Sequence, residues 1–295
     1  MRRVQWVLFV AAFAAFGAVA VGSAAAAPAA QTGTLADGHV SECAVTPPED
    51  HADPENPDGV IGWVDGYWYD EPVAVTPDDG FNQSELDRLA ARTAAQVESL
   101  RCLDYKQMPP LRTISREEYR ENVAGQVQNQ TTAEGELYEN AQYAARMTVG
   151  NEADALAAFV EAQAAFPAAF YRPDQDYMAF VTDDETVEGL RQPTLAHELV
   201  HALQDQYHDV GAIFDEPTND EYLAAGSVVE SDATLVEEQY TANCNRGGWA
   251  TDCIIPPRGQ PPEIPNWAIA LNQQFQYTSA VVESVYDEGG TEAVD

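Results

Sequence analysis

The sequence predicts an α+β fold in which a small sheet with hairpins precedes two helices that carry candidate site residues. Two observations predict it. Short apolar and aromatic runs flank turn sequences at Asp65-Gly66 and at residues 173–176, a pattern typical of β-hairpins. Longer stretches, from Ser84 to Cys102 and from Pro193 onward, repeat apolar residues at helical spacing. We therefore expect strands to come first and to be followed by the helix that Pro193 opens.

Residues 1–30 have the pattern of a secretory signal peptide. Arg2 and Arg3 precede an apolar run from Val4 to Val21, and an alanine-rich stretch with small residues suited to cleavage follows it. The run is about 18 residues long, which is marginal for a membrane span of roughly 20 residues. An uncleaved anchor is the alternative that stays open. We expect the protein to be secreted or held at the cell surface, without further membrane contact.

The rest of the chain divides into a linker and one domain. Residues 31–59 are acidic and rich in Pro, Gly and Asp, which predicts an extended linker, with a removable pro-segment as the alternative. Residues 60–295 are numerous enough for one sizeable domain with a real core. Its last helical segment, from Gln274, runs into Gly289-Gly290 and then restarts briefly. This restart leaves open that the domain continues beyond the given sequence.

The charge is strongly negative. The chain has 49 acidic and 14 basic residues, a formal net charge of −35; without Arg2 and Arg3 the balance is 49 against 12, or −37. Such a surface repels itself unless salt screens it, and the screening length falls from ~10 Å at 0.1 M to ~3 Å at 1 M salt. We therefore expect adaptation to high salt. Nucleic-acid binding is excluded, and acids spread along the whole chain argue against a cationic partner.

Four cysteines in an exported chain predict two disulfides, with three possible connectivities. Cys244 and Cys253 enclose a short loop, which makes them the favoured local pair and leaves Cys43 with Cys102. None of the four has the spacing of a metal ligand.

The sequence between the two predicted hairpins indicates several helices, which we expect to form a scaffold. Ser84, with Asp87 three residues later, marks the start of the first helix. Ser115 is a candidate cap for a short second helix. The remaining predicted elements are strands at residues 111–114, 169–172 and 177–181, and helices at residues 116–123, 132–147 and 152–166.

A candidate metal site lies on the helix that Pro193 opens. His197 and His201 are four residues apart, so their side chains lie about 40° apart on one helical face and can reach one ion. Zinc accepts neutral imidazole nitrogens and, in catalytic sites, keeps one position for water. Glu198 adjoins the first histidine and is placed to remove a proton from that water. The alternative is an ordinary amphipathic helix with two histidines on its wet face, but the chain has only five histidines.

The stretch from His197 to His201 resembles the HExxH motif of the zinc peptidases called zincins. The metzincin branch has a glycine three residues after the second histidine and a third histidine six residues after it. Gln204 and Tyr207 occupy those positions here, and His208 misses by one. The Gly-Thr-x-Asp signature of the aspzincins is absent.

The resemblance is therefore to the gluzincin branch, in which a glutamate on a second helix completes the metal site. The predicted helix at residues 219–240 carries Glu230, 29 residues after His201. Many gluzincins have an aspartate four residues after this glutamate, where Thr234 stands in this chain. The resemblance implies a Zn²⁺ cofactor held by His197, His201 and Glu230.

Two further acids on the same helix qualify this assignment. Asp232 lies about 200° from Glu230 on an ideal helix, so both carboxylates cannot face one ion. We expect Asp232 to form a buried structural pair or, alternatively, to orient a histidine ligand. Glu237, seven residues after Glu230, is the alternative third ligand.

The resemblance implies a gluzincin-like α+β domain whose small mixed sheet lies above the motif helix, with a protein or peptide substrate along the sheet edge. Glu198 would be the catalytic general base. The donor to the oxyanion stays open among Tyr207, His208, Tyr240 and Tyr277. The alternative functions are a zinc hydrolase of non-peptide amides and a cell-surface binding protein with a vestigial metal site; the presence of Glu198 disfavours the latter.

Overall fold

The computed structural model describes residues 43–145, 154–165, 169–213, 218–249, 251–257 and 279–294. The predicted signal peptide, the first part of the predicted linker, and Tyr277 lie outside these residues. Among the helices described, none is both long and apolar enough to cross a membrane. The architecture is α+β, as the sequence predicted.

The central sheet has three strands in the order β3-β5-β4. They are β3 (Leu111–Ile114), β4 (Ala169–Arg172) and β5 (Tyr177–Val181), and each matches its predicted range. β3 pairs with β5 in parallel and β4 pairs with β5 antiparallel, so the sheet is mixed. β4 is therefore an edge strand, joined to β5 by the second predicted hairpin.

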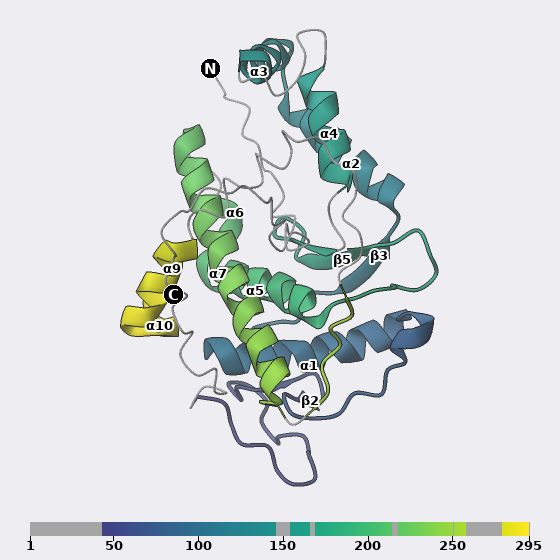
Figure 1. The fold of residues 1–295 in the computed structure, drawn as a ribbon, viewed down its shortest axis with the longest axis vertical. Helices are drawn as coiled ribbons and strands as arrows, with labels where there is room; N and C mark the ends of the chain where they lie inside the picture. The colour runs from purple at the N-terminus through teal and green to yellow at the C-terminus, as the bar shows by residue number, and fades with distance from the viewer. Residues whose placement is uncertain are drawn as a thin grey trace, which may run out of the picture.

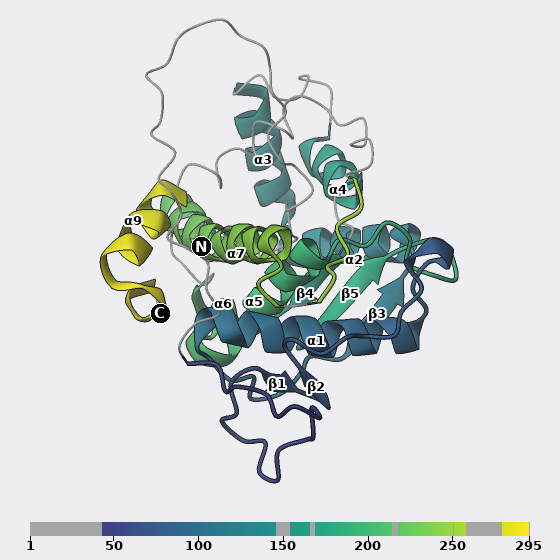
Figure 2. The ribbon, with the colours of Figure 1, turned by 60° about the horizontal axis from the view of Figure 1, so that its bottom comes forward.

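Both faces of the sheet are covered by helices (Figure 2). Side chains of a strand alternate between faces, and this alternation divides the core into two clusters. The larger cluster adjoins α1 (Gln83–Arg101) and α5 (Gln192–His208), and receives from the sheet Ala169, Tyr171, Met178 and Phe180. The smaller cluster adjoins α2 (Arg116–Gln130) and α4 (Ala155–Ala165), and receives from the sheet Ile114, Phe170, Tyr177, Ala179 and Val181.

The start of α1 differs from the prediction. Asn82, rather than Ser84, is the N-cap, because the Asn82 side chain accepts the backbone N–H of Glu85 while the Glu85 carboxylate accepts the backbone N–H of Asn82. The cap of α2 is Ser115, as predicted. That helix extends past its predicted end, and Val127 in the extension packs against the smaller core cluster. The helix α3 (Ala133–Ala145) follows it.

A long helix, α7 (Asn219–Arg246), crosses α5 and also packs against α1 (Figure 1). It runs beyond its predicted end and stops at Gly247, which takes the left-handed conformation and donates its N–H to Asn243 and Cys244 carbonyls. The short helix α6 (Val210–Ile213) precedes it. The helix α9 (Ser279–Gly289) lies beside α7, and α10 (Thr291–Val294) packs against α9; both fall within the predicted C-terminal helical segment.

The N-terminal hairpin, β1 (Trp63–Val64) and β2 (Tyr67–Trp68), forms around the predicted turn, and a 3₁₀ helix at Pro77–Asp79 leads to α1. Both predicted disulfides are present. One bond joins Cys43 to Cys102 at the end of α1. The two bonds indicate an extracellular or otherwise oxidising compartment.

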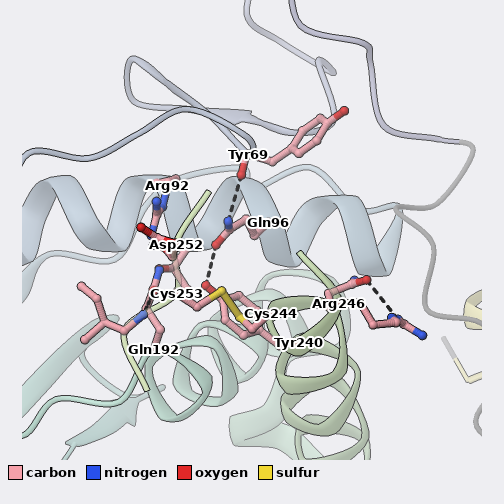
Figure 3. Close-up of a disulfide and its surroundings, with 12 residues drawn as sticks. Tyr69, Arg92, Gln96, Gln192, Tyr240, Cys244, Arg246, Asp252 and Cys253 are labelled. Carbon is pink, nitrogen blue, oxygen red and sulfur yellow. Dashed lines mark hydrogen bonds between the residues drawn. A yellow bond between two sulfur atoms is a disulfide. The ribbon is translucent and has the colours of Figure 1, made fainter. Parts of the chain in front are cut away.

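The other disulfide, Cys244–Cys253, holds the segment after α7 against the helical core (Figure 3). Beside it, the Tyr240 hydroxyl donates to Gln96 on α1, and the Gln96 amide donates to the Tyr69 carbonyl at 2.9 Å. This chain of contacts fastens α7, α1 and the N-terminal hairpin to one another.

Candidate metal centre

The helix α5 places its predicted site residues between two other helices. Its apolar arc, which includes Leu195 and Leu199, is fully buried in the larger core cluster. The opposite arc is also buried, because α7 packs across it: His197, Glu198 and His201 are at most 1% exposed. The structure therefore differs from that of an amphipathic helix with histidines on a wet face.

Three of the predicted site residues converge in this buried space. The Nε2 atoms of His197 and His201 lie 3.1 Å apart, with the two rings nearly perpendicular. The Oε2 atom of Glu230, on α7, lies 3.4 Å from Nε2 of His197 and 3.8 Å from Nε2 of His201. The ligand atoms of these three residues all lie within 4.8 Å of one another. This buried group could hold a metal ion.

Glu198 lies beside the group and is only half satisfied. Its Oε2 atom accepts the backbone N–H of Tyr171, on the edge strand β4, at 2.9 Å. Its Oε1 atom is buried, and no described residue forms a hydrogen bond with it. Burial is the main cause that raises the pKa of Glu198 to about 8, helped by the negative charge of Glu230. Glu198 therefore offers one oxygen with unused capacity to accept a proton.

The two histidines have opposite electrostatic settings. Burial alone lowers the pKa of His197, but the nearby carboxylates of Glu230 and Glu237 outweigh it and raise the pKa to about 10. Burial lowers the pKa of His201 to about 4 in spite of the charge of Glu230. Glu230 and Glu237 thus favour positive charge on His197, whereas burial opposes positive charge on His201.

The alternative ligand Glu237 occupies a different place from Glu230. Its Oε2 atom lies 3.6 Å from Nδ1 of His197, on the ring nitrogen opposite to the one that faces Glu230. Glu237 therefore lies behind the histidine and outside the three-residue group. From this position its carboxylate can orient the ring and increase the basicity of Nε2.

Asp232 faces away from the group, as the helical angle predicted. Its Oδ1 atom forms a buried ion pair with Arg101 at the end of α1. Its Oδ2 atom accepts a hydrogen bond from the Gln204 amide at 2.7 Å. Asp232 thus has the structural pair we expected, and it reaches a histidine only through Gln204, whose Oε1 lies 2.8 Å from Nδ1 of His201.

Two functional contacts were missed by sequence reasoning. Gln204 is three residues after His201, and this spacing places side chains together on a helix, so the pattern contained a signal for it. The contact of the Tyr171 backbone N–H with Glu198 could not be predicted from the sequence, because it depends on how β4 packs against α5.

The candidate oxyanion donors do not converge on the group. The Tyr207 hydroxyl donates to the carbonyl of Asp104, and the Tyr240 hydroxyl donates to Gln96, so both are committed elsewhere. His208 is the last residue of α5. Tyr277 lies outside the described residues.

The donor set is two imidazole nitrogens and one carboxylate, with a half-satisfied carboxylate beside it. This set matches the ligands that catalytic zinc sites use while leaving a position for water. No protein-family model, curated protein or solved structure matches the chain.

Proposed function

We propose that this protein is a secreted zinc-dependent peptidase, adapted to high salt. The observation that carries the proposal is the buried group of His197, His201 and Glu230 beside the unpaired Oε1 of Glu198. A structural zinc site is closed by four protein ligands and has no use for a carboxylate base beside it. Three ligands with an adjacent base are what a hydrolytic site needs.

The chemistry of the donors favours zinc over other ions. Calcium and magnesium prefer oxygen ligands, whereas two of the three donors here are imidazole nitrogens. The glutamate third ligand supports a gluzincin-like site. The departure from that pattern at Thr234 is offset by Glu237, which takes up the position behind His197.

In amide hydrolysis, the proposed metal ion, Glu198 and the Tyr171 N–H would have different roles. Bound zinc would polarise the scissile carbonyl and acidify a water molecule. Through Oε1, Glu198 would accept a proton from the water that adds to the carbonyl carbon, and would deliver it to the nitrogen of the leaving amine as the C–N bond breaks. The Tyr171 N–H holds Oε2 of Glu198, which keeps the carboxylate in one orientation and leaves Oε1 free for proton transfer.

The edge strand supports a peptide substrate over a small amide. Among the strands that the structure describes, β4 pairs only with β5, and its Tyr171 N–H is directed to Glu198 instead of to β5. An extended peptide that aligned with this edge would pass beside the catalytic base, and strand addition is a common mode of peptide recognition.

The proposal is tested with the exported protein, purified in molar salt. We expect stoichiometric zinc and cleavage of casein or unstructured peptides, with loss of cleavage on chelation and recovery on adding zinc. Glu198→Gln is expected to lower the cleavage rate about 10²–10⁴-fold, the usual contribution of general base catalysis, while zinc content stays unchanged. A zinc-loaded wild type that cleaves no peptide would overturn the proposal. Cleavage of small amides in that same preparation would identify the amide hydrolase instead.

The third ligand is tested by a matched pair of variants. Glu230→Ala is expected to lose zinc under dialysis conditions in which Glu237→Ala retains it, because only Glu230 faces Nε2 of both histidines. The reverse result would show that Glu237 is the ligand.

A further inference from the structure

The side-chain amide of Gln204 connects the metal group to a buried ion pair. Its Nε2 atom lies 3.0 Å from the carbonyl oxygen of Val229 and 2.7 Å from Oδ2 of Asp232. Its Oε1 atom lies 2.8 Å from Nδ1 of His201. His201 and Gln204 belong to α5, and Val229 and Asp232 belong to α7. Arg101 of α1 pairs with Asp232, so the network connects three helices.

The hydrogen-bond partners fix which way this amide points. A backbone carbonyl and an ionised carboxylate paired with arginine can only accept hydrogen bonds. The NH₂ group of Gln204 must therefore face Val229 and Asp232, and its oxygen must face His201. An amide oxygen cannot donate, so Nδ1 of His201 is the atom that carries the proton.

We propose that Gln204 is a positioning residue that holds His201 in the Nδ1–H tautomer and thereby presents the Nε2 lone pair to the metal. A neutral imidazole carries one ring proton, so a proton on Nδ1 leaves Nε2 free. That nitrogen is the one that faces His197 and Glu230. The histidine is thus prepared for the ion before the ion binds.

The ion pair of Asp232 with Arg101 keeps the amide in this orientation. Asp232 is 4% exposed and Arg101 is also 4% exposed, so the pair lies in a medium where charges interact strongly. Arg101 pairs with Oδ1 of Asp232, and Oδ2 of Asp232 accepts from the NH₂ group of Gln204 and so fixes its direction. The two histidines are therefore oriented differently: a carboxylate, Glu237, approaches His197, whereas a neutral amide contacts His201.

This inference rests on the proposed metal site, but it can be tested without any metal. The protonated ring nitrogen of a histidine is identified from its ¹⁵N resonances, recorded on the metal-free, ¹⁵N-labelled protein. With only five histidines in the chain, a His201→Asn variant assigns the signal. We expect the Nδ1–H form of His201 in the wild type. A wild type that shows the Nε2–H form would overturn the inference, and this measurement requires no substitution in the network.

A substitution then measures the effect on metal affinity. Gln204→Leu removes the acceptor at Nδ1, so we expect Nε2–H signal to appear with Glu230 as its acceptor, and zinc affinity to fall roughly 10–100-fold, as measured by chelator competition. Gln206→Leu is the matched control on the same helix, because the hydrogen bonds of the Gln206 amide within the described part of the chain go to Lys106 and Gln107, in the loop after α1. It should leave both the tautomer and the zinc affinity unchanged.

The outcomes separate this inference from the proposed function. Zinc affinity of Gln204→Leu within about threefold of the wild-type value, below the range expected for such a contact, would overturn the positioning role, even if peptide cleavage is observed. An Nδ1–H tautomer in a wild type that cleaves no peptide would sustain the orientation of His201 and reject the peptidase instead.

Discussion

Two buried glutamates, Glu98 and Glu198, have the same burial and opposite surroundings. Each is fully buried, and burial is the main cause that raises the pKa of each to about 8. By these two properties they cannot be told apart. Either would be a candidate functional residue on the ground of its perturbed pKa alone.

Their hydrogen-bond partners separate them. Both oxygens of Glu98 accept backbone N–H groups, from Gly62 at 2.9 Å and from Tyr105 at 2.8 Å. Glu198 has one such partner, and its other oxygen is unpaired beside two histidines. Glu98 therefore joins the N-terminal hairpin and the loop after α1 to that helix, whereas Glu198 keeps capacity for chemistry. An unused acceptor, more than a shifted pKa, distinguishes the site from the scaffold.

The largest expected effect concerns the surroundings of Glu98. The bond Cys43–Cys102 ties the N-terminal segment to the end of the helix that carries Glu98, across a sequence separation of 59, whereas Cys244–Cys253 spans 9. Loop-closure entropy then predicts that replacing the first pair by serine lowers the free energy of unfolding by ~4 kcal/mol, and the second pair by ~2.5 kcal/mol. Urea unfolding at constant high salt measures both. Equal losses, or a larger loss at Cys244–Cys253, would show that the N-terminal segment adds little to the scaffold.

The sequence carried the information that is local. The strands 111–114, 169–172 and 177–181 were predicted to the residue, because alternation and turn residues are properties of a few neighbours. The pairing of the cysteines followed from the short loop at Cys244. His197, Glu198 and His201 followed from helical spacing alone.

The contacts between residues distant in sequence could be found only from the structure. Glu198 owes its fixed oxygen to a backbone N–H on β4, and a backbone group has no identity in a sequence. Asp232 was placed on the correct side of its helix, but its partner Arg101 is 131 residues away. Glu98 lies inside the first predicted helix, and nothing local distinguishes it from the many other acids of this chain.

The next prediction compares the effects of Glu98→Gln and Glu198→Gln on stability and on cleavage. Glu98→Gln replaces one acceptor oxygen by an NH₂ group that opposes a buried N–H, which costs about 1–3 kcal/mol of unfolding free energy. Cleavage by the folded protein should stay at the wild-type rate. Glu198→Gln, described above, should show the reverse: a large loss of rate without a comparable loss of stability. The pair is compared by urea unfolding and by initial cleavage rates below the unfolding transition. A Glu98→Gln variant that is stable and inactive would contradict this division.

The last comparison concerns the pH dependence of stability that Glu98 contributes. Its folded pKa, about 8, lies above the ordinary value of 4.5, so the native state binds this proton more tightly than the unfolded state does. Stability from this group is therefore present in full below about pH 4.5 and falls as the pH rises toward about 8. The amide introduced by Glu98→Gln cannot ionise, so the loss that this substitution causes should be largest near about pH 5 and should shrink near about pH 8. Unfolding free energies of the two proteins at matched salt give this difference directly. If the difference grows with pH, the two backbone N–H bonds outweigh the cost of burial, and Glu98 is ionised in the folded protein.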